Sequence, residues 1–168
     1  MDTVKAIQTV LAVRKFKDTP LPREVVRGIV EAGRLTASSI NGQPWHFVVV
    51  QDKNTLQQLG QLAKTGPYIA QAPMAIAVCM LQSRYALSDC SRAIQDMVLA
   101  AWDMGVGSNW VGFNNLADVK PLLGIPQDVD VLAILPFGYP AEQIGAGIKK
   151  RKSLGEVASS ERYGQPFS

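Results

Sequence analysis

Residues 36–50 read TASSINGQPWHFVVV, so that small and amide residues run directly into an aromatic and β-branched segment. The part from Trp45 to Gln51 predicts a strand, because aromatic and β-branched side chains suit a pleated sheet. The residues before it carry more hydrogen-bonding groups than a connection of two to six residues needs. Binding residues concentrate in loops held by a rigid scaffold, so we expect this loop to hold a ligand.

The composition indicates one globular domain over residues 1–168. Hydrophobic residues make up 47% of the chain and charged residues 18%, which supplies a sizeable core. The net charge of +3 does not by itself indicate nucleic-acid binding. Four basic residues adjoin at 149–152, but no aromatic stacking platform accompanies them, so nucleic acid is a distant alternative.

The cysteines and the N-terminus favour a soluble cytoplasmic protein with reduced thiols. Cys79 and Cys90 lack the spacing and histidine neighbours of a zinc site, so we expect no metal. The first residues, MDTVKAIQTV, do not resemble a signal peptide. No window reaches the roughly 20 apolar residues that a membrane helix requires.

The apolar periodicity predicts an α+β fold, in which a small central mixed sheet is flanked by helices. Helices are expected over residues 3–12, 22–35, 54–63, 88–104 and 115–123. Strands are expected over residues 45–51, 74–81, 109–112 and 131–137. Ser88 is expected to cap the long helix, and Gly105 to follow its end. That helix is apolar on more than one stripe, and a partner subunit is one way to cover the second stripe.

Side chains that carry chemistry by themselves are scarce. His46 is the only histidine, and it falls inside a predicted strand. The chain lacks a G-x-S-x-G elbow, a Walker loop and a G-x-G-x-x-G loop. We therefore expect no catalytic side chain, and a cofactor that brings its own reactivity if the protein is an enzyme.

Several short motifs, in chain order, resemble those of the nitroreductase family. The most specific is the N-x-Q-P-W pattern at 41–45, preceded by Ser38. The other matching segments, which together span nearly the whole chain, are VRKF at 13–16, QAP at 71–73, LAAWDMGVGS at 99–108, WVGF at 110–113, GYP at 138–140 and RKSL at 151–154.

The resemblance implies a homodimer with FMN at the subunit interface, and hydride transfer from NAD(P)H to a small acceptor, a nitroaromatic or quinone, by a ping-pong mechanism. It places the Arg14 guanidinium, with Lys15 in the same motif, near the flavin ring. The single domain would end in a tail, about 141–168, that packs on the partner. Dehydrogenation or dehalogenation by the same cofactor is a second reading. A dimer module that binds FMN weakly with little turnover is a third.

The resemblance assigns the remaining cofactor contacts to three segments. Side chains of the loop would reach the ribityl chain and ring edge of the other subunit's FMN; they are Ser38, Ser39, Asn41 and Gln43. Backbone N–H groups would pass the ring edge at Trp110, Val111 and Gly112. Lys149 and Arg151 alternate, so in an extended segment both could grip one phosphate.

Each of these assignments has a purely structural alternative that the sequence leaves open. Arg14 and the basic cluster could be solvated surface charges. The serines and amides of the loop could satisfy loop backbone, and Gly112 could mark a bulge or strand end.

The chain departs from the family pattern just before Arg14. Val10, Leu11 and Ala12 stand where the family usually has Arg-Arg-Ser. The missing charge-assisted hydrogen bonds are worth roughly 1.5–3 kcal/mol each. We therefore expect FMN to bind more loosely than is usual in the family.

Overall fold

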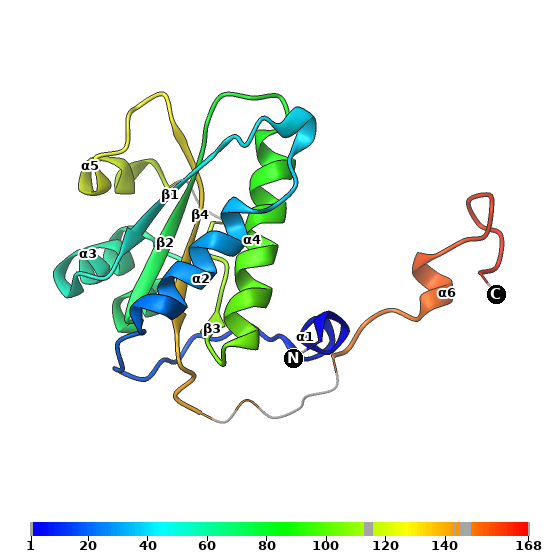
Figure 1. Cartoon of the computed structure of the whole chain (residues 1–168), viewed down its shortest axis with the longest axis horizontal. Coiled ribbons are helices and arrows are strands. Elements are labelled where there is room, and N and C mark those ends of the chain that lie inside the picture. The colour runs from blue at the N-terminus through cyan, green and yellow to red at the C-terminus, as the bar shows by residue number, and fades with distance from the viewer. Residues whose placement is uncertain (1, 113–115, 143, 145–148, 168) are drawn as a thin grey trace.

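The computed structural model describes residues 2–112, 116–142, 144 and 149–167. Its centre is a sheet of four strands in the order β1-β2-β4-β3 (Figure 1). The strands are β1 (Trp45–Val50), β2 (Met74–Met80), β3 (Gly107–Ser108) and β4 (Asp130–Gly138), and each neighbouring pair is antiparallel. A parallel bridge between Ala12 and Ser108 adds the stretch after the first helix to the sheet.

The longer helices cover the two faces of this sheet. The helices are α1 (Thr3–Thr9), α2 (Arg23–Arg34), α3 (Lys53–Leu62), α4 (Ala86–Asp103), α5 (Lys120–Leu123) and α6 (Leu154–Val157), with 3-10 turns η1 (Ser39–Asn41), η2 (Pro67–Gln71) and η3 (Ala117–Val119). Figure 1 shows α2 and α4 on one face and α3 and α5 on the other. The predicted α+β class is confirmed, but the four strands pair antiparallel, and the parallel contribution to the predicted mixed sheet is the single bridge between Ala12 and Ser108.

Strand β2 separates the two larger hydrophobic clusters of the core. Its run MAIAVCM is buried along nearly its whole length, as the continuous apolar stretch predicts. Ile76 and Val78 pack with the α2 and α4 side, whereas Ala75 and Ala77 pack with α3 and η2. This alternation follows from side chains pointing to opposite faces of a strand.

The predicted strand over residues 109–112 is wrong in position. The paired strand is Gly107–Ser108, and the same register resumes only at Val111, which forms an isolated bridge with Ile134. Between these points the register places Pro136 of β4 beside the edge strand, and a proline has no backbone N–H to donate to a neighbouring strand. The edge strand is therefore interrupted where the sequence pattern predicts its centre.

The first helix is shorter than predicted. It is capped by Asp2, whose carboxylate accepts from the Lys5 N–H, but it ends at Thr9 instead of residue 12. Val10 already has extended ψ, and Val13 N–H donates to the Ser108 carbonyl at 2.8 Å. Sheet pairing thus takes over from helix propensity over the last residues of the predicted helix.

The long helix begins before its predicted cap. Its first residue is Ala86, its N-cap is Tyr85, and the Ser88 hydroxyl donates to the Tyr85 carbonyl. At the other end Gly105 has φ of 75°, the left-handed conformation expected after a helix. Of the helix predicted over 115–123, Asn115 lies outside the described residues, Leu116 is the N-cap, and η3 followed by α5 occupies residues 117–123.

Both thiols are expected to be inert in the folded protein. Cys79 and Cys90 are buried and unpaired, and burial, followed by the charge of Asp89, raises the pKa of Cys90 to about 11. Burial also raises the pKa of Cys79. Because the thiolate is the reactive form, a thiol reagent at pH 8 should modify neither before unfolding and both after it. Rapid labelling of either thiol in the native protein would contradict this burial.

Candidate active site

A cavity of about 680 Å³ lies between α1, the middle of α4 and the segment after β3. One side of the cavity is lined by apolar residues, and the other sides are lined by cationic and polar side chains. The lining residues are Ile7, Gln8, Val10, Leu11, Ala12, Ile94, Gln95, Val98, Ser108, Asn109, Trp110, Lys149 and Arg151. Its size is that of a small-molecule or cofactor site.

Lys149 and Arg151 both line this cavity, as their alternation predicts. The Lys149 ammonium donates to the Ile7 carbonyl at 2.6 Å, which anchors the basic segment to α1. Partial burial and the neighbouring charge of Arg151 lower the pKa of Lys149. Two cations so close together make this part of the cavity favourable for a multivalent anion.

The apolar wall comes from the residues that depart from the family pattern. Val10, Leu11 and Ala12 line the cavity, so no cation or hydroxyl enters it from this stretch. Among the residues that line the cavity, the charged ones are Lys149 and Arg151.

Arg14 and Lys15 do not line the cavity. They are exposed between Val13 and Phe16, which are buried and hold the backbone in place. The Lys15 ammonium donates to the Glu142 carboxylate at 2.7 Å, and this hydrogen bond raises the pKa of Lys15. The two cations of this motif therefore lie outside the cavity.

Trp110, Val111 and Gly112 have different environments. Trp110 lines the cavity, whereas Val111 is buried and pairs with β4. A Cβ at Gly112 would lie 2.7 Å from the Leu132 carbonyl oxygen and 2.8 Å from Nε1 of Trp110. Close packing against β4 and the indole therefore accounts for the glycine.

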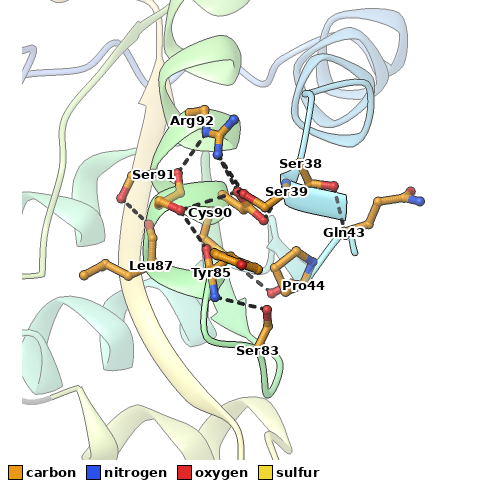
Figure 2. Close-up of polar contacts among 12 residues, drawn as sticks. Ser38, Ser39, Gln43, Pro44, Ser83, Tyr85, Leu87, Cys90, Ser91 and Arg92 are labelled. Atoms are coloured by element: carbon orange, nitrogen blue, oxygen red, sulfur yellow. Dashed lines mark hydrogen bonds and ion pairs between the residues drawn. The ribbon is translucent and has the colours of Figure 1, made fainter. Parts of the chain in front are cut away.

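The loop before β1 lies elsewhere, at the first turn of α4 (Figure 2). The Ser38 hydroxyl accepts from the Gln43 N–H, and the Gln43 amide donates to the Asn41 side chain at 3.3 Å. The Ser39 hydroxyl donates to Asp89 at 3.1 Å. None of the predicted binding residues of this loop lines the cavity.

Sequence reasoning missed Asp89 and Arg92. The Asp89 carboxylate is buried, accepts from the Ser39 N–H at 3.0 Å and pairs with Arg92 at 2.6 Å. A signal was present, because Asp89 falls on the same helical stripe as the buried Ala86 and Ala93. A carboxylate in such a stripe needs partners, since burying it unpaired is costly.

Two other kinds of site receive no support from the described part of the chain. It contains no group of three or more His, Cys, Asp or Glu residues that could hold a metal ion. Likewise, none of its helices is long and apolar enough to cross a membrane.

The fold and the cavity define an α+β domain with a site of cofactor size that carries two cations. The model of the nitroreductase family matches residues 11–84 and 82–139, so the chain belongs to this family. This confirms the resemblance of the motifs.

Individual relatives cover most of the chain. A Methanothermobacter thermautotrophicus protein, provisionally named an NADH dehydrogenase/NAD(P)H nitroreductase, is 34% identical over 86% of this chain and 81% of its own. The NADPH-flavin oxidoreductase of Vibrio harveyi is 30% identical over 94% of this chain and 74% of its own. The solved FMN-dependent nitroreductase of Clostridium difficile has a TM-score of 0.81 at 25% identity, over 98% of this chain and 99% of that one.

Proposed function

We propose that the protein is an FMN-dependent NAD(P)H oxidoreductase that reduces a small acceptor such as a nitroaromatic or a quinone. The observation that carries this proposal is the cavity, where Lys149 and Arg151 face an apolar and aromatic lining. The names of the flavin- and FMN-dependent relatives point the same way.

The residues present fit FMN in their chemistry. Lys149 and Arg151 offer charge-assisted hydrogen bonds to a phosphate, and Arg151 can form two at once. Trp110 and the apolar wall offer surface for a flat ring, while Ser108 and Asn109 offer polar contacts. When bound, FMN would supply the redox chemistry of a ping-pong cycle between NAD(P)H and the acceptor.

The chain's own residues would then hold the flavin and stabilise its reduced form. The Arg14 guanidinium is exposed beside the buried Val13 and lies outside the cavity, so it would stabilise the negative charge that reduction leaves on the ring where the ring reaches beyond the cavity. The backbone N–H groups of Trp110 and Gly112 would hydrogen-bond the ring edge, whereas the Val111 N–H already donates to the Ile134 carbonyl at 3.1 Å. The mechanism needs no side chain as a proton donor, because water can supply the proton.

A second copy of the chain would complete the site. The loop residues Ser38, Asn41 and Gln43 do not reach the cavity of their own subunit, so a partner's loop would supply them. The α6 segment also suits this arrangement: Figure 1 shows it standing away from the sheet and its helices. Leu154 and Val157 on it are 63% and 64% exposed, and we infer that the tail packs on the partner.

Replacing Leu154 and Val157 together with serine should therefore weaken the dimer. Burying each side chain fully is worth roughly 1.5–3 kcal/mol, so the dimer dissociation constant should rise at least about tenfold. Sedimentation velocity over a concentration series measures this constant. Arg162→Ala, in the same tail, is the matched control and should leave it unchanged. An unaltered constant in the double variant would exclude this role for the tail.

An absorption spectrum of the purified protein with added FMN tests the proposed function. Flavin bands that stay with the protein through gel filtration and bleach with NADH or NADPH under nitrogen are expected. Parallel double-reciprocal lines with a nitroaromatic or quinone acceptor would support the ping-pong cycle. A protein that stays colourless in excess FMN would overturn the proposal.

The apolar stretch Val10–Ala12 favours one rival, a module that binds FMN weakly and turns over little. The proposed enzyme and this rival would share the absorption bands of bound FMN but differ in the rate at which NADH or NADPH reduces it. Bands that appear with FMN but persist for hours with excess NADH and NADPH would favour this rival. Turnover without activity on nitro compounds or quinones would instead point to another flavin reaction, such as dehydrogenation or dehalogenation.

A further inference from the structure

The turn between Ser38 and Pro44 is strained. Ile40, Asn41 and Gln43 have φ of 52°, 54° and 46°, in the left-handed region that residues other than glycine seldom adopt. Ile40 is β-branched, which makes this conformation especially unfavourable, and it is 88% exposed. Packing within the subunit therefore does not explain why the turn keeps this shape.

The buried carboxylate of Asp89 holds the beginning of the turn. It accepts from both donors of Ser39, the backbone N–H at 3.0 Å and the hydroxyl at 3.1 Å. Arg92, one turn further along α4, donates to the same carboxylate at 2.6 Å and balances its charge. Figure 2 shows Ser39 and Arg92 together where the loop meets the helix.

The end of the turn is held separately. The Pro44 carbonyl accepts from the Leu81 N–H at 3.0 Å and from the Cys90 thiol at 3.3 Å. Within the turn, the Ser38 hydroxyl accepts from the Gln43 N–H at 3.0 Å. The strained residues thus lie between two anchor points, and Asp89 is the anchor at their N-terminal side.

We propose that Asp89 is a positioning residue, which fixes the strained turn so that Asn41 and Gln43 present their amides to the flavin of the partner subunit. The flavin part of this inference rests on the proposed function. Ser39 then serves as the link to Asp89, and its hydroxyl is not directed at the ligand.

The test compares Asp89→Asn with two control variants of the same chain. The asparagine keeps the size of the side chain but removes the charge and one acceptor. Asp96→Asn makes the same change on the same helix, where the carboxylate accepts from Thr36 outside the turn. Val119→Ala removes buried methyl groups from the core cluster that contains Ala75 and Ala77, away from α4, and so lowers the stability of the protein.

The first measurement is hydrogen exchange without flavin. The amides of Asn41, Gly42 and Gln43, which donate within the turn, should exchange at least about tenfold faster in Asp89→Asn alone. The second is FMN titration, in which the dissociation constant should rise about tenfold in this variant and change little in either control. Fluorescence of the free flavin reports this binding.

The outcomes separate the inference from the function on which it rests. Unchanged exchange in Asp89→Asn would overturn the anchoring role. Faster exchange with wild-type FMN affinity would overturn the positioning role, since the turn would then be free to move without harming the site. A wild-type protein that binds no FMN would overturn the proposed function and the flavin part of the inference, while the exchange rates would still decide the anchoring role.

Discussion

Exchanging Lys149 and Arg151 together for alanine is expected to weaken FMN binding about a hundredfold or more. Hydrogen bonds to a charged group contribute roughly 1.5–3 kcal/mol each, and about 1.4 kcal/mol corresponds to a factor of ten in affinity. These are the two cations that line the cavity. Calorimetric titration of the protein with FMN measures the loss.

Two controls make this experiment specific for the phosphate. Lys150→Ala with Lys152→Ala removes the same number of charges from the same segment, but from residues that do not line the cavity. This pair should bind FMN like the wild type. Riboflavin, which lacks the phosphate, should bind the Lys149 and Arg151 double variant as well as it binds the wild type. Equal loss for both flavins would mean that the two cations do not contact the phosphate.

Gly107→Ala is expected to destabilise the protein by about 1–3 kcal/mol, the usual cost of forcing an extra methyl group into a packed core. A Cβ at this position would lie 2.2 Å from Cγ2 and 2.7 Å from Cβ of Val13. Val13 is buried and cannot easily give way, because it lies in the segment that pairs with Ser108. The variant should displace the stretch that carries Arg14, and so weaken flavin binding as well.

Denaturant unfolding of Gly107→Ala and of three comparison variants measures the change in the free energy of unfolding. Gly28→Ala, in helix α2, is the matched control, since the added Cβ would lie 3.5 Å from the Met104 side chain, an ordinary van der Waals distance. Val13→Ala removes two of the three crowding atoms, so the double variant should lose less stability than the sum of the single ones. Strict additivity would show that Val13 is not the obstacle.

Local sequence patterns were sufficient for most of the fold. The apolar run of β2, the helical spacing of α2 and α4, and Gly105 after α4 each depend on residues close in the chain. The wrong predictions lie where distant segments meet. Helix propensity over 10–12 yielded to pairing with Ser108, and the ladder to β4 was broken by Pro136, whose effect depends on a register that the sequence does not display.

The candidate site divides in the same way. The order of the motifs was enough to establish the family, and their residue types indicated an anion site and a polar loop. Only the tertiary structure brought Lys149 and Arg151 to one cavity with Val10–Ala12, left Arg14 and the loop outside it, and joined Ser39 to Asp89. Residue type and spacing record the hydrogen bonds and apolar faces within one segment, whereas contacts between segments depend on how the sheet and α4 pack. The sequence by itself therefore determined which groups were available, and tertiary packing decided which of them share a site.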